Sequence, residues 1–273
     1  MTSRRTDPVE IMDILVFREG AFRTTSLPVI REVLLEVRLD GRRMAAIACT
    51  GEHAEELAVG FLRSEGRIGR AGDIGRIEQM PDGPPDPAWP GEVLTVEITS
   101  VGGTAAAEET TGGDTITSSG GRSGRRRPAG PILKAGMPTI PPEKVLRLVD
   151  DLVEACVLHE RTRGVHGAAL ADPDGLLAVR EDIGRHNALD MLSGYALLNG
   201  IDCSEKFLVR TGRASVEIVS KAIVMGIPIL LSLGVPTTEA VRSAERAGIT
   251  LVGRIRKRSM NIYSHDERIG RTT

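Results

Sequence analysis

Aromatic residues are scarce in this sequence. They make up 3% of the 273 residues, so leucine, isoleucine, valine and alanine must supply most of the core. Few aromatic rings also weigh against binding of single-stranded nucleic acid by base stacking. The chain also has no excess of positive charge, since its formal net charge is −2. Because nucleic acids are polyanions, we expect no nucleic-acid partner.

The sequence also shows no pattern typical of a membrane span or a secretion signal. No apolar run reaches the length of a bilayer span, and the N-terminal stretch MTSRRTDPVE has no apolar signal core. We therefore expect no membrane partner and a cytoplasmic location. The apolar share of 41% is typical of a globular chain with a core of its own.

Several motifs of reactive sites are missing. The sequence has no Walker A ending, no GxSxG elbow and no PCxxC, which argues against P-loop nucleotide hydrolysis, serine hydrolysis and zinc deamination. The three cysteines, Cys49, Cys156 and Cys203, are far apart and show no CxxC or zinc-ligand spacing. We expect free thiols and no metal site.

The cysteines differ in their local patterns. Cys156 falls on the apolar stripe of a predicted helix that begins after Pro141, and this favours a buried, inert thiol. Cys49 ends a predicted strand just before a helix, whose N-terminus would lower its pKa, although a small core residue is the better interpretation. Cys203 precedes a strand and is expected to be exposed.

The chain divides into four predicted segments. Residues 1–26 are expected to form an N-terminal tail. Residues 27–100 alternate apolar and polar positions around a turn at Asp40–Gly41, which predicts a small β-rich domain with one helix. Residues 101–131 have almost no large apolar side chains, which predicts a flexible loop or linker. Residues 132–273 alternate strands and helices, which predicts a layered α/β domain.

Two polar clusters fall where α/β sheets present ligands. The first includes Arg185, His186 and Asn187, at the start of a predicted helix, where free N–H groups and the helix dipole attract anions. A helix cap beside a solvated arginine is an equally good interpretation of that spacing. The second lies between a strand and a helix and includes Thr211, Arg213 and Ser215. It suits a phosphate group, although an ordinary strand-to-helix turn is somewhat the better interpretation of the spacing alone.

A third cluster is basic and lies between the last two predicted strands. It consists of Arg254, Ile255, Arg256, Lys257, Arg258 and Ser259. Four cations among six residues could clamp a pyrophosphate, whereas arginines at strand ends also serve as solubilising edge protection.

Several motifs between residues 28 and 269 resemble those of a known family. They include EELAVGFLRSEGRI (55–68), REDIGRHNALD (180–190), TGRASVEIVSKA (211–222) and GITLVGRIRKRSMNIY (248–263). On these residues the chain resembles the formate dehydrogenase accessory sulfurtransferases (FdhD). Taken together, the motifs are highly specific.

The resemblance implies a function and a fold. Such proteins receive sulfur as a persulfide from a cysteine desulfurase, and they pass it to the bis-molybdopterin guanine dinucleotide cofactor of molybdenum or tungsten formate dehydrogenase. They bind that cofactor, serve the formate dehydrogenase apo-enzyme and act as homodimers. The resemblance also implies a C-terminal domain similar to the cytidine-deaminase fold without its zinc, and it equates residues 254–259 with the guanine-dinucleotide-binding segment.

The chain departs from the family pattern at the sulfur-carrying loop. Where the family resembles TSSCGxCG, this sequence reads TSSGGRSG, with Gly120 and Ser123 at the two cysteine positions. Neither side chain can carry a persulfide, because that chemistry requires a thiolate. Smaller departures are Arg163 where glycine is usual, Arg254 where phenylalanine is usual, and Ser259 where a second basic residue is usual.

Three hypotheses therefore stay open from the sequence. The chain is an accessory protein that binds the cofactor without relaying sulfur through the loop, and whether it is an enzyme is left undecided. Alternatively, it is a sulfurtransferase that uses a displaced thiol, Cys49 or Cys203. In the third hypothesis it is a non-catalytic regulatory or chaperone protein that binds the cofactor or a guanine nucleotide.

Overall fold

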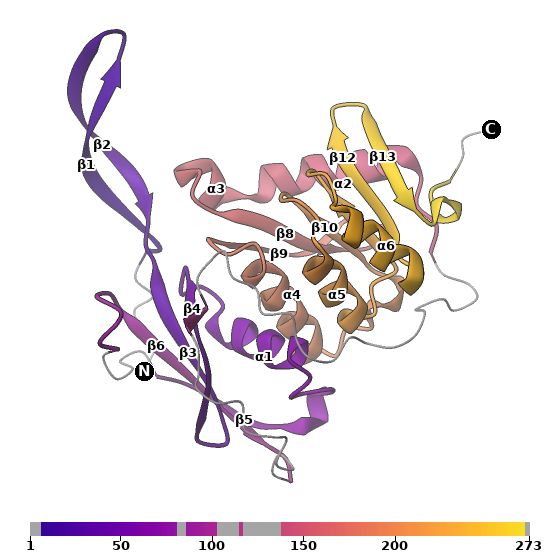
Figure 1. The fold of residues 1–273 in the computed structure, drawn as a ribbon, viewed down its shortest axis with the longest axis horizontal. Coiled ribbons are helices and arrows are strands. Elements are labelled where there is room, and N and C mark those ends of the chain that lie inside the picture. Colours follow the sequence, from indigo (N-terminus) through magenta and orange to yellow (C-terminus); the bar gives the residue numbers. More distant parts are fainter. Residues whose placement is uncertain (1–6, 81–85, 103–114, 117–137, 271–273) are drawn as a thin grey trace.

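Two sheets and a projecting hairpin make up the architecture (Figure 1). The computed structural model describes residues 7–80, 86–102, 115–116 and 138–270. Within these ranges the fold is mixed α/β, as the sequence predicts. No helix in this part of the chain is long and apolar enough to span a bilayer.

The first sheet contains five strands in the order β5-β6-β3-β4-β7. They are β3 (Val33–Leu39), β4 (Arg42–Cys49), β5 (Ile74–Met80), β6 (Val93–Ser100) and β7 (Thr115–Ile116). The predicted turn at Asp40–Gly41 joins β3 and β4, and both residues have the positive φ that a tight hairpin turn requires. Helix α1 (Ala54–Ser64) packs its apolar side chains against this sheet, and a short 3₁₀ turn, η1 (Ala71–Asp73), leads into β5.

The second sheet contains six strands in the order β13-β12-β11-β10-β8-β9. They are β8 (His166–Ala171), β9 (Leu176–Asp182), β10 (Phe207–Arg210), β11 (Ile229–Ser232), β12 (Thr250–Arg256) and β13 (Ser259–Ser264). Strands β10, β11 and β12 are parallel, and β9 runs in the same direction because β8 is antiparallel to both β9 and β10. The carboxyl ends of these four strands therefore lie at one edge of the sheet.

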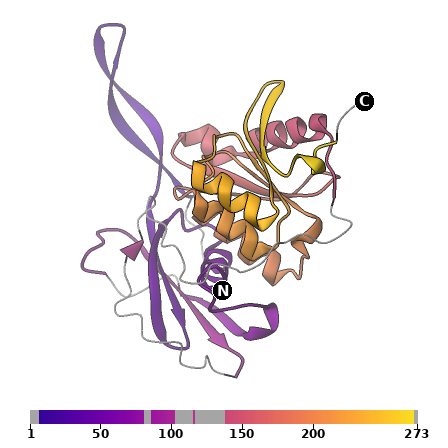
Figure 2. The same ribbon diagram turned by 45° about the vertical axis from the view of Figure 1, so that its right-hand side comes forward.

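Helices cover both faces of the second sheet (Figure 2). Helices α4 (Asn187–Leu198), α5 (Val216–Met225) and α6 (Thr238–Ala247) bury one face, and α2 (Pro142–Ala155) buries the other. Two short 3₁₀ turns lie beside the strands in sequence: η2 (Cys203–Glu205) precedes β10, and η3 (Asp266–Arg268) follows β13. This is the layered α/β arrangement that the alternating pattern predicts. The likeness to a cytidine-deaminase fold stays a prediction, as do the domain boundaries.

Helix α3 (Val157–Thr162) follows α2 and ends at Arg163. This arginine has a φ of 56°, in the left-handed region that favours glycine at the end of a helix. The glycine that the family resemblance places here thus has a conformational reason.

The two layers meet where α1 crosses α4. A Cβ atom on Gly60 would lie 1.7 Å from the carbonyl oxygen of Asp190, and one on Gly194 would lie 1.9 Å from that of Glu56. The two helix backbones are therefore in direct contact, and only glycine permits this separation. Asp190 is itself buried and accepts from Lys221 at 2.6 Å and from Ser64 at 2.7 Å, which fixes the same crossing from both sides.

Residues 9–30 form a β-hairpin, which corrects the expectation of a tail over residues 1–26. Strand β1 (Val9–Arg18) pairs antiparallel with β2 (Ala21–Ile30). Its side chains are mostly exposed, so burial does not explain its order. The two strands pair through their backbones, and the turn places Glu19 and Gly20 at positive φ, as a two-residue hairpin requires.

Candidate functional site

The three polar clusters predicted from the sequence lie along the carboxyl edge of the second sheet. The first follows β9, the second follows β10, and the third begins near the end of β12. Open α/β sheets bind ligands at this edge. The edge is thus the candidate site.

Arg210, the last residue of β10, is the most unusual charge in the site. It is 1% exposed and donates through Nη1 to the carbonyl oxygens of Gly212 and Arg213, while its Nε has no hydrogen-bond partner. Burial, and then the charge of Arg185, lower the pKa of Arg210 to about 9. It is still protonated at pH 7, and in the described part of the chain no carboxylate forms an ion pair with it. A buried cation without a counter-ion is costly unless an anion arrives.

His186 joins the first and second clusters. Its Nε2 lies 2.9 Å from a carboxylate oxygen of Glu217 in α5, although the angles do not make a hydrogen bond. Burial lowers the pKa of His186 to about 3, and the nearby charges of Lys221, Arg185 and Arg210 act in the same direction. The ring is therefore neutral at pH 7, because burial, and then the surrounding positive charges, disfavour its protonated form.

The second cluster forms a tight backbone turn against the neighbouring loop. Thr211 exchanges hydrogen bonds with the backbone of Gly167 in β8. A Cβ atom on Gly234, which follows β11, would lie 2.7 Å from the backbone nitrogen of Arg213. Ser215 is the N-cap of α5, and its hydroxyl is buried without a partner. The exposed Arg213 side chain forms no ion pair within the described residues.

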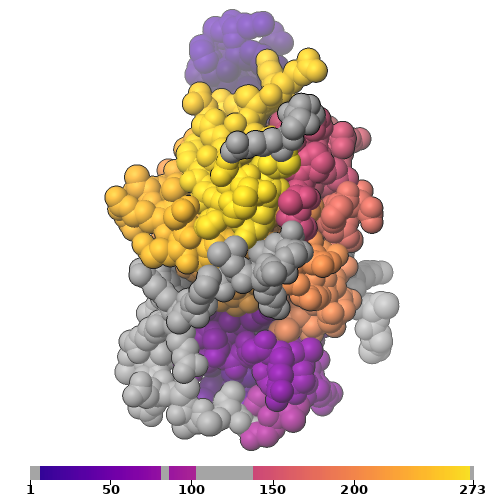
Figure 3. All heavy atoms as spheres, turned by 90° about the vertical axis from the view of Figure 1, so that its right-hand side faces the viewer, coloured from indigo at the N-terminus to yellow at the C-terminus, as the bar shows by residue number. Residues whose placement is uncertain are grey.

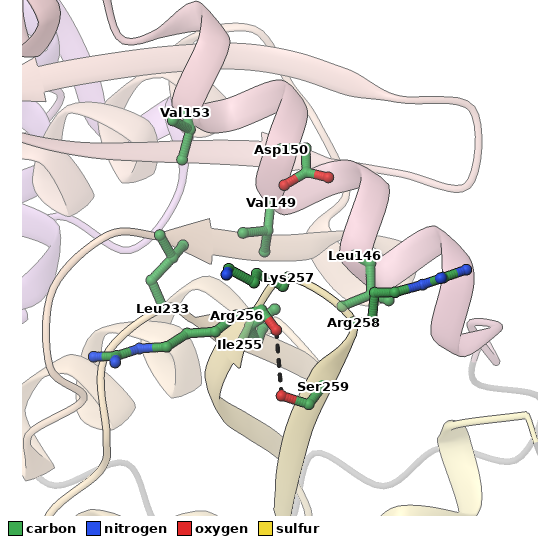
Figure 4. A pocket seen from close by; sticks show the side chains of 10 residues that line it. All are labelled: Leu146, Val149, Asp150, Val153, Leu233, Ile255, Arg256, Lys257, Arg258 and Ser259. Carbon is green, nitrogen blue, oxygen red and sulfur yellow. Dashed lines mark hydrogen bonds between the residues drawn. The ribbon is translucent and has the colours of Figure 1, made fainter.

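The third cluster lies on the other side of that loop, towards α2. The backbone nitrogen of Arg254 donates to Gly234, but the residues after it turn away in the hairpin between β12 and β13. They line a pocket of about 580 Å³, together with four side chains of α2 and Leu233 (Figure 4). The pocket lining consists of Leu146, Val149, Asp150, Val153, Leu233, Ile255, Arg256, Lys257, Arg258 and Ser259. The structure thus joins the first two clusters and sets most of the third apart from them.

One buried carboxylate links the candidate site to the first sheet through hydrogen bonds. Asp182 is fully buried at the end of β9 and accepts from the backbone and hydroxyl of Thr50, from Gly184 and from the side chain of Asn187. Burial raises the pKa of Asp182 to about 6, against the effect of these donors. Asn187 also donates to the carbonyl of Ala48 in β4. Asn187 is the first residue of α4, and its side chain forms this bridge rather than capping the helix.

Gly120 and Ser123, the positions equated with the family's cysteines, lie outside the described residues. The nearest described segment before them is β7. It pairs with β4 through Ala46 and Ile47, and β4 leads directly to Thr50.

All three cysteines are buried, so the expected exposure of Cys203 is wrong. Cys49, Cys156 and Cys203 are each at most 3% exposed. Burial raises the pKa of all three thiols, to about 11 for Cys203, to about 12 for Cys156 and well above the usual range for Cys49. The burial of Cys49 outweighs any effect of the α1 N-terminus, and the charge of Asp182 adds to it.

We expect no thiol of the folded protein to react rapidly with a disulfide reagent, because both access and thiolate formation are suppressed. The measurement is a colorimetric thiol assay in native buffer, with the protein unfolded in guanidinium chloride as the control, where all three thiols must react. Rapid reaction of one thiol in native buffer would contradict the burial, and would restore that cysteine as a candidate sulfur carrier.

Sequence reasoning missed several residues of the site. Arg210 is not part of any predicted cluster, although the sequence carries a signal for it, namely an arginine at the end of an otherwise apolar strand. His166 lies beside this turn, and the partial burial of its ring, with the charges of Arg210 and Arg185, lowers its pKa. Val153 of α2 is apolar but 53% exposed, on the wall of the pocket.

The fold and the site define a two-sheet α/β protein with a cationic site at the carboxyl edge of its second sheet. The FdhD/NarQ family model matches residues 30–270. The chain therefore belongs to the FdhD/NarQ family.

Relatives match over nearly the whole chain. The "Sulfur carrier protein FdhD" of Geobacillus kaustophilus is 36% identical over 262 residues, which cover 94% of this chain and 95% of that protein. The protein of the same name from Bacillus subtilis is 34% identical over 265 residues, covering 95% and 97%. A crystal structure of a putative formate dehydrogenase accessory protein from Desulfotalea psychrophila has a TM-score of 0.75 at 24% identity, covering 96% of this chain and 99% of that one. This structural similarity supports the fold alone.

Proposed function

We propose that this chain is an accessory protein for the maturation of formate dehydrogenase, and that it binds the bis-molybdopterin guanine dinucleotide cofactor at the carboxyl edge of its second sheet. Its family membership, and relatives named as sulfur carriers, support the first part. The chemistry of the edge supports the second part. By the family resemblance, the bound cofactor would carry the molybdenum or tungsten and accept the sulfur.

The buried, unpaired Arg210 carries the proposal. A dinucleotide presents phosphates, and a phosphate can accept charge-assisted hydrogen bonds from a buried guanidinium that has no carboxylate partner. Three buried polar atoms near this edge lack hydrogen-bond partners, namely Arg210 Nε, His186 Nε2 and Ser215 Oγ. These residues, with Arg185 and Arg213, fit a polyanionic ligand. They would bind and orient it, and Arg256 to Ser259 would hold a further part in the pocket beside α2.

The thiols support a role without sulfur relay by this chain. Gly120 and Ser123 replace the family's cysteines, and the three remaining thiols are buried with raised pKa values. A displaced thiol would need access and a lowered pKa, and no cysteine of the chain combines the two. The proposed partners are the formate dehydrogenase apo-enzyme and a second copy of the chain. A cysteine desulfurase would then have no acceptor thiol on this protein.

The test is purification from cells that make the cofactor, followed by mass spectrometry of the bound small molecules and of the protein after treatment with a persulfide-loaded desulfurase. We expect bound molybdopterin guanine dinucleotide and no sulfur adduct on any residue. Retention of a guanine nucleotide without molybdopterin would instead favour a regulatory nucleotide-binding protein. Absence of both ligands would overturn the proposed cofactor binding, and a sulfur adduct on Cys49 or Cys203 would overturn the proposed role without sulfur relay.

A further inference from the structure

The β1–β2 hairpin carries an unusual amount of exposed apolar surface. It projects away from both sheets in Figure 1, and it rises above the rest of the molecule in Figure 3. Six of its large apolar side chains are between 38% and 68% exposed. They are Ile11, Met12, Leu15, Phe17, Phe22 and Leu27.

Such a ribbon needs a covering partner. A two-stranded sheet is marginally stable in water by itself, and this one has apolar side chains on both faces. Ile11, Leu15 and Phe17 lie on one face, and Met12 and Leu27 lie on the other. A sheet of more than two strands is more stable, because side chains of neighbouring strands shield one another.

The outer edge of β1 is open. Among the described residues, β1 pairs with β2 alone. A two-residue turn closes on a hydrogen-bonded pair, here Arg18 with Ala21. The odd-numbered residues of β1 therefore direct their N–H and C=O groups towards the open edge, where another strand can bind them.

The sequence of β1 is complementary to itself in one antiparallel register. When Ile14 lies opposite its own copy, Glu10 faces the second copy's Arg18 and Met12 faces the second copy's Val16. Ile11 then faces the second copy's Phe17 on the other side of the sheet. Opposite charges and apolar pairs in facing positions stabilise a sheet, and a two-fold axis forms every contact twice.

Neighbouring registers are worse. A two-fold axis perpendicular to the sheet requires facing residues to have the same parity. Shifting the centre to Asp13 places two carboxylates opposite each other, and shifting it to Leu15 places Arg18 against Met12. With the centre at Ile14, Asp13 faces Leu15, and its carboxylate is already held by the Ser26 hydroxyl at 2.6 Å.

We propose that β1 pairs antiparallel with β1 of a second copy about a two-fold axis at Ile14, forming a four-stranded sheet between the two molecules. This specifies the strand, the register and the charges of the interface, and it does not depend on the proposed cofactor binding.

Cysteine cross-linking tests the register directly. In the variant Ile14→Cys, the two new thiols face each other at a Cα separation of about 4.5 Å, within the range of a disulfide. The matched control is Val16→Cys, whose two thiols would be offset by about 13 Å along the strand. The native cysteines are buried, so they do not compete. We expect mild oxidation to give a covalent dimer for the first variant only. Equal cross-linking of both variants, or of neither, would overturn the register.

Charge exchange tests the same interface without oxidation. By sedimentation velocity we expect the unmodified chain to be a dimer, and Arg18→Glu to weaken dimerisation about tenfold, because two like-charge pairs replace two attractive ones. Arg18→Glu combined with Glu10→Arg should restore the affinity to within about threefold. Glu10 also lies 3.6 Å from Arg31, so Arg18→Glu is the cleaner single variant. Arg23→Glu on β2 is the control and should have no effect. A monomeric unmodified chain, or a dimer insensitive to Arg18→Glu, would refute the proposal.

Discussion

Gly194→Ala is expected to lower the free energy of unfolding by about 3–5 kcal/mol, more than an ordinary core substitution. The new Cβ atom would lie 1.9 Å from the carbonyl oxygen of Glu56 and 2.7 Å from its carbonyl carbon. Both atoms belong to the backbone of α1, so no side chain can rotate away and the two helices must separate. Alanine in an exposed helix would instead be favourable by about 1 kcal/mol, so helix propensity predicts the opposite sign.

Gly175→Ala is the matched control for this substitution. Gly175 lies in the turn between β8 and β9, where a Cβ atom would meet nothing within 4 Å and no positive φ is required. Urea denaturation of both variants gives the comparison, and Gly175→Ala should change the free energy of unfolding by less than about 0.5 kcal/mol. Equal midpoints for the two variants would show that α1 and α4 tolerate a wider separation.

Arg210→Met is expected to weaken GDP binding at least tenfold while leaving the protein folded. A charge-assisted hydrogen bond to a phosphate contributes about 1.5–3 kcal/mol, which corresponds to a loss of about tenfold or more. The free energy of unfolding should change by less than about 1 kcal/mol. Removing a buried charge without a counter-ion offsets the lost hydrogen bonds to Gly212 and Arg213.

Calorimetric titration with GDP, and mass spectrometry of the cofactor retained on purification, measure this loss. Arg242→Met is the matched control, since Arg242 is an exposed arginine of α6 that is paired with Glu239. Arg210→Lys keeps the charge but not the guanidinium geometry, and its affinity should fall between those of Arg210→Met and the unmodified protein. Unchanged affinity in Arg210→Met would assign Arg210 a purely structural role in the turn.

Local patterns predict most of the elements. The alternation around Asp40–Gly41 and the apolar stripe of the helix after Pro141 correspond to β3, β4 and α2. The hairpin over residues 9–30 was missed because its apolar residues alternate weakly and it buries little within one molecule. Strands are predicted from apolar–polar alternation, which arises when one face is buried against a core, and this hairpin has no such buried face.

The sequence predicts the segments that the structure brings together at the candidate site, but not Arg210. Arg185, His186, Thr211, Arg213 and Ser215 follow strands that end at one edge, and strand direction alone brings them there. Arg210 was missed because its importance depends on burial without a counter-ion, which is a property of the three-dimensional neighbourhood. Most of the third cluster lies beside α2, since the β12–β13 hairpin extends past the ends of β10 and β11.

The carboxylate of Asp182 has a thermodynamic consequence. One of its oxygens accepts from Thr50, directly after β4, and the other accepts from Gly184 and Asn187 at the candidate site, so a single carboxylate serves both the docking of the sheets and the shape of the site. A ligand that stabilises this hydrogen-bond network by ordering the turn at Arg185 to Asn187 would strengthen the attachment of β4, and loosening of β4 would then weaken the binding of that ligand by the same factor. Ligand affinity at the second sheet and the local stability of the first sheet are in this way thermodynamically linked.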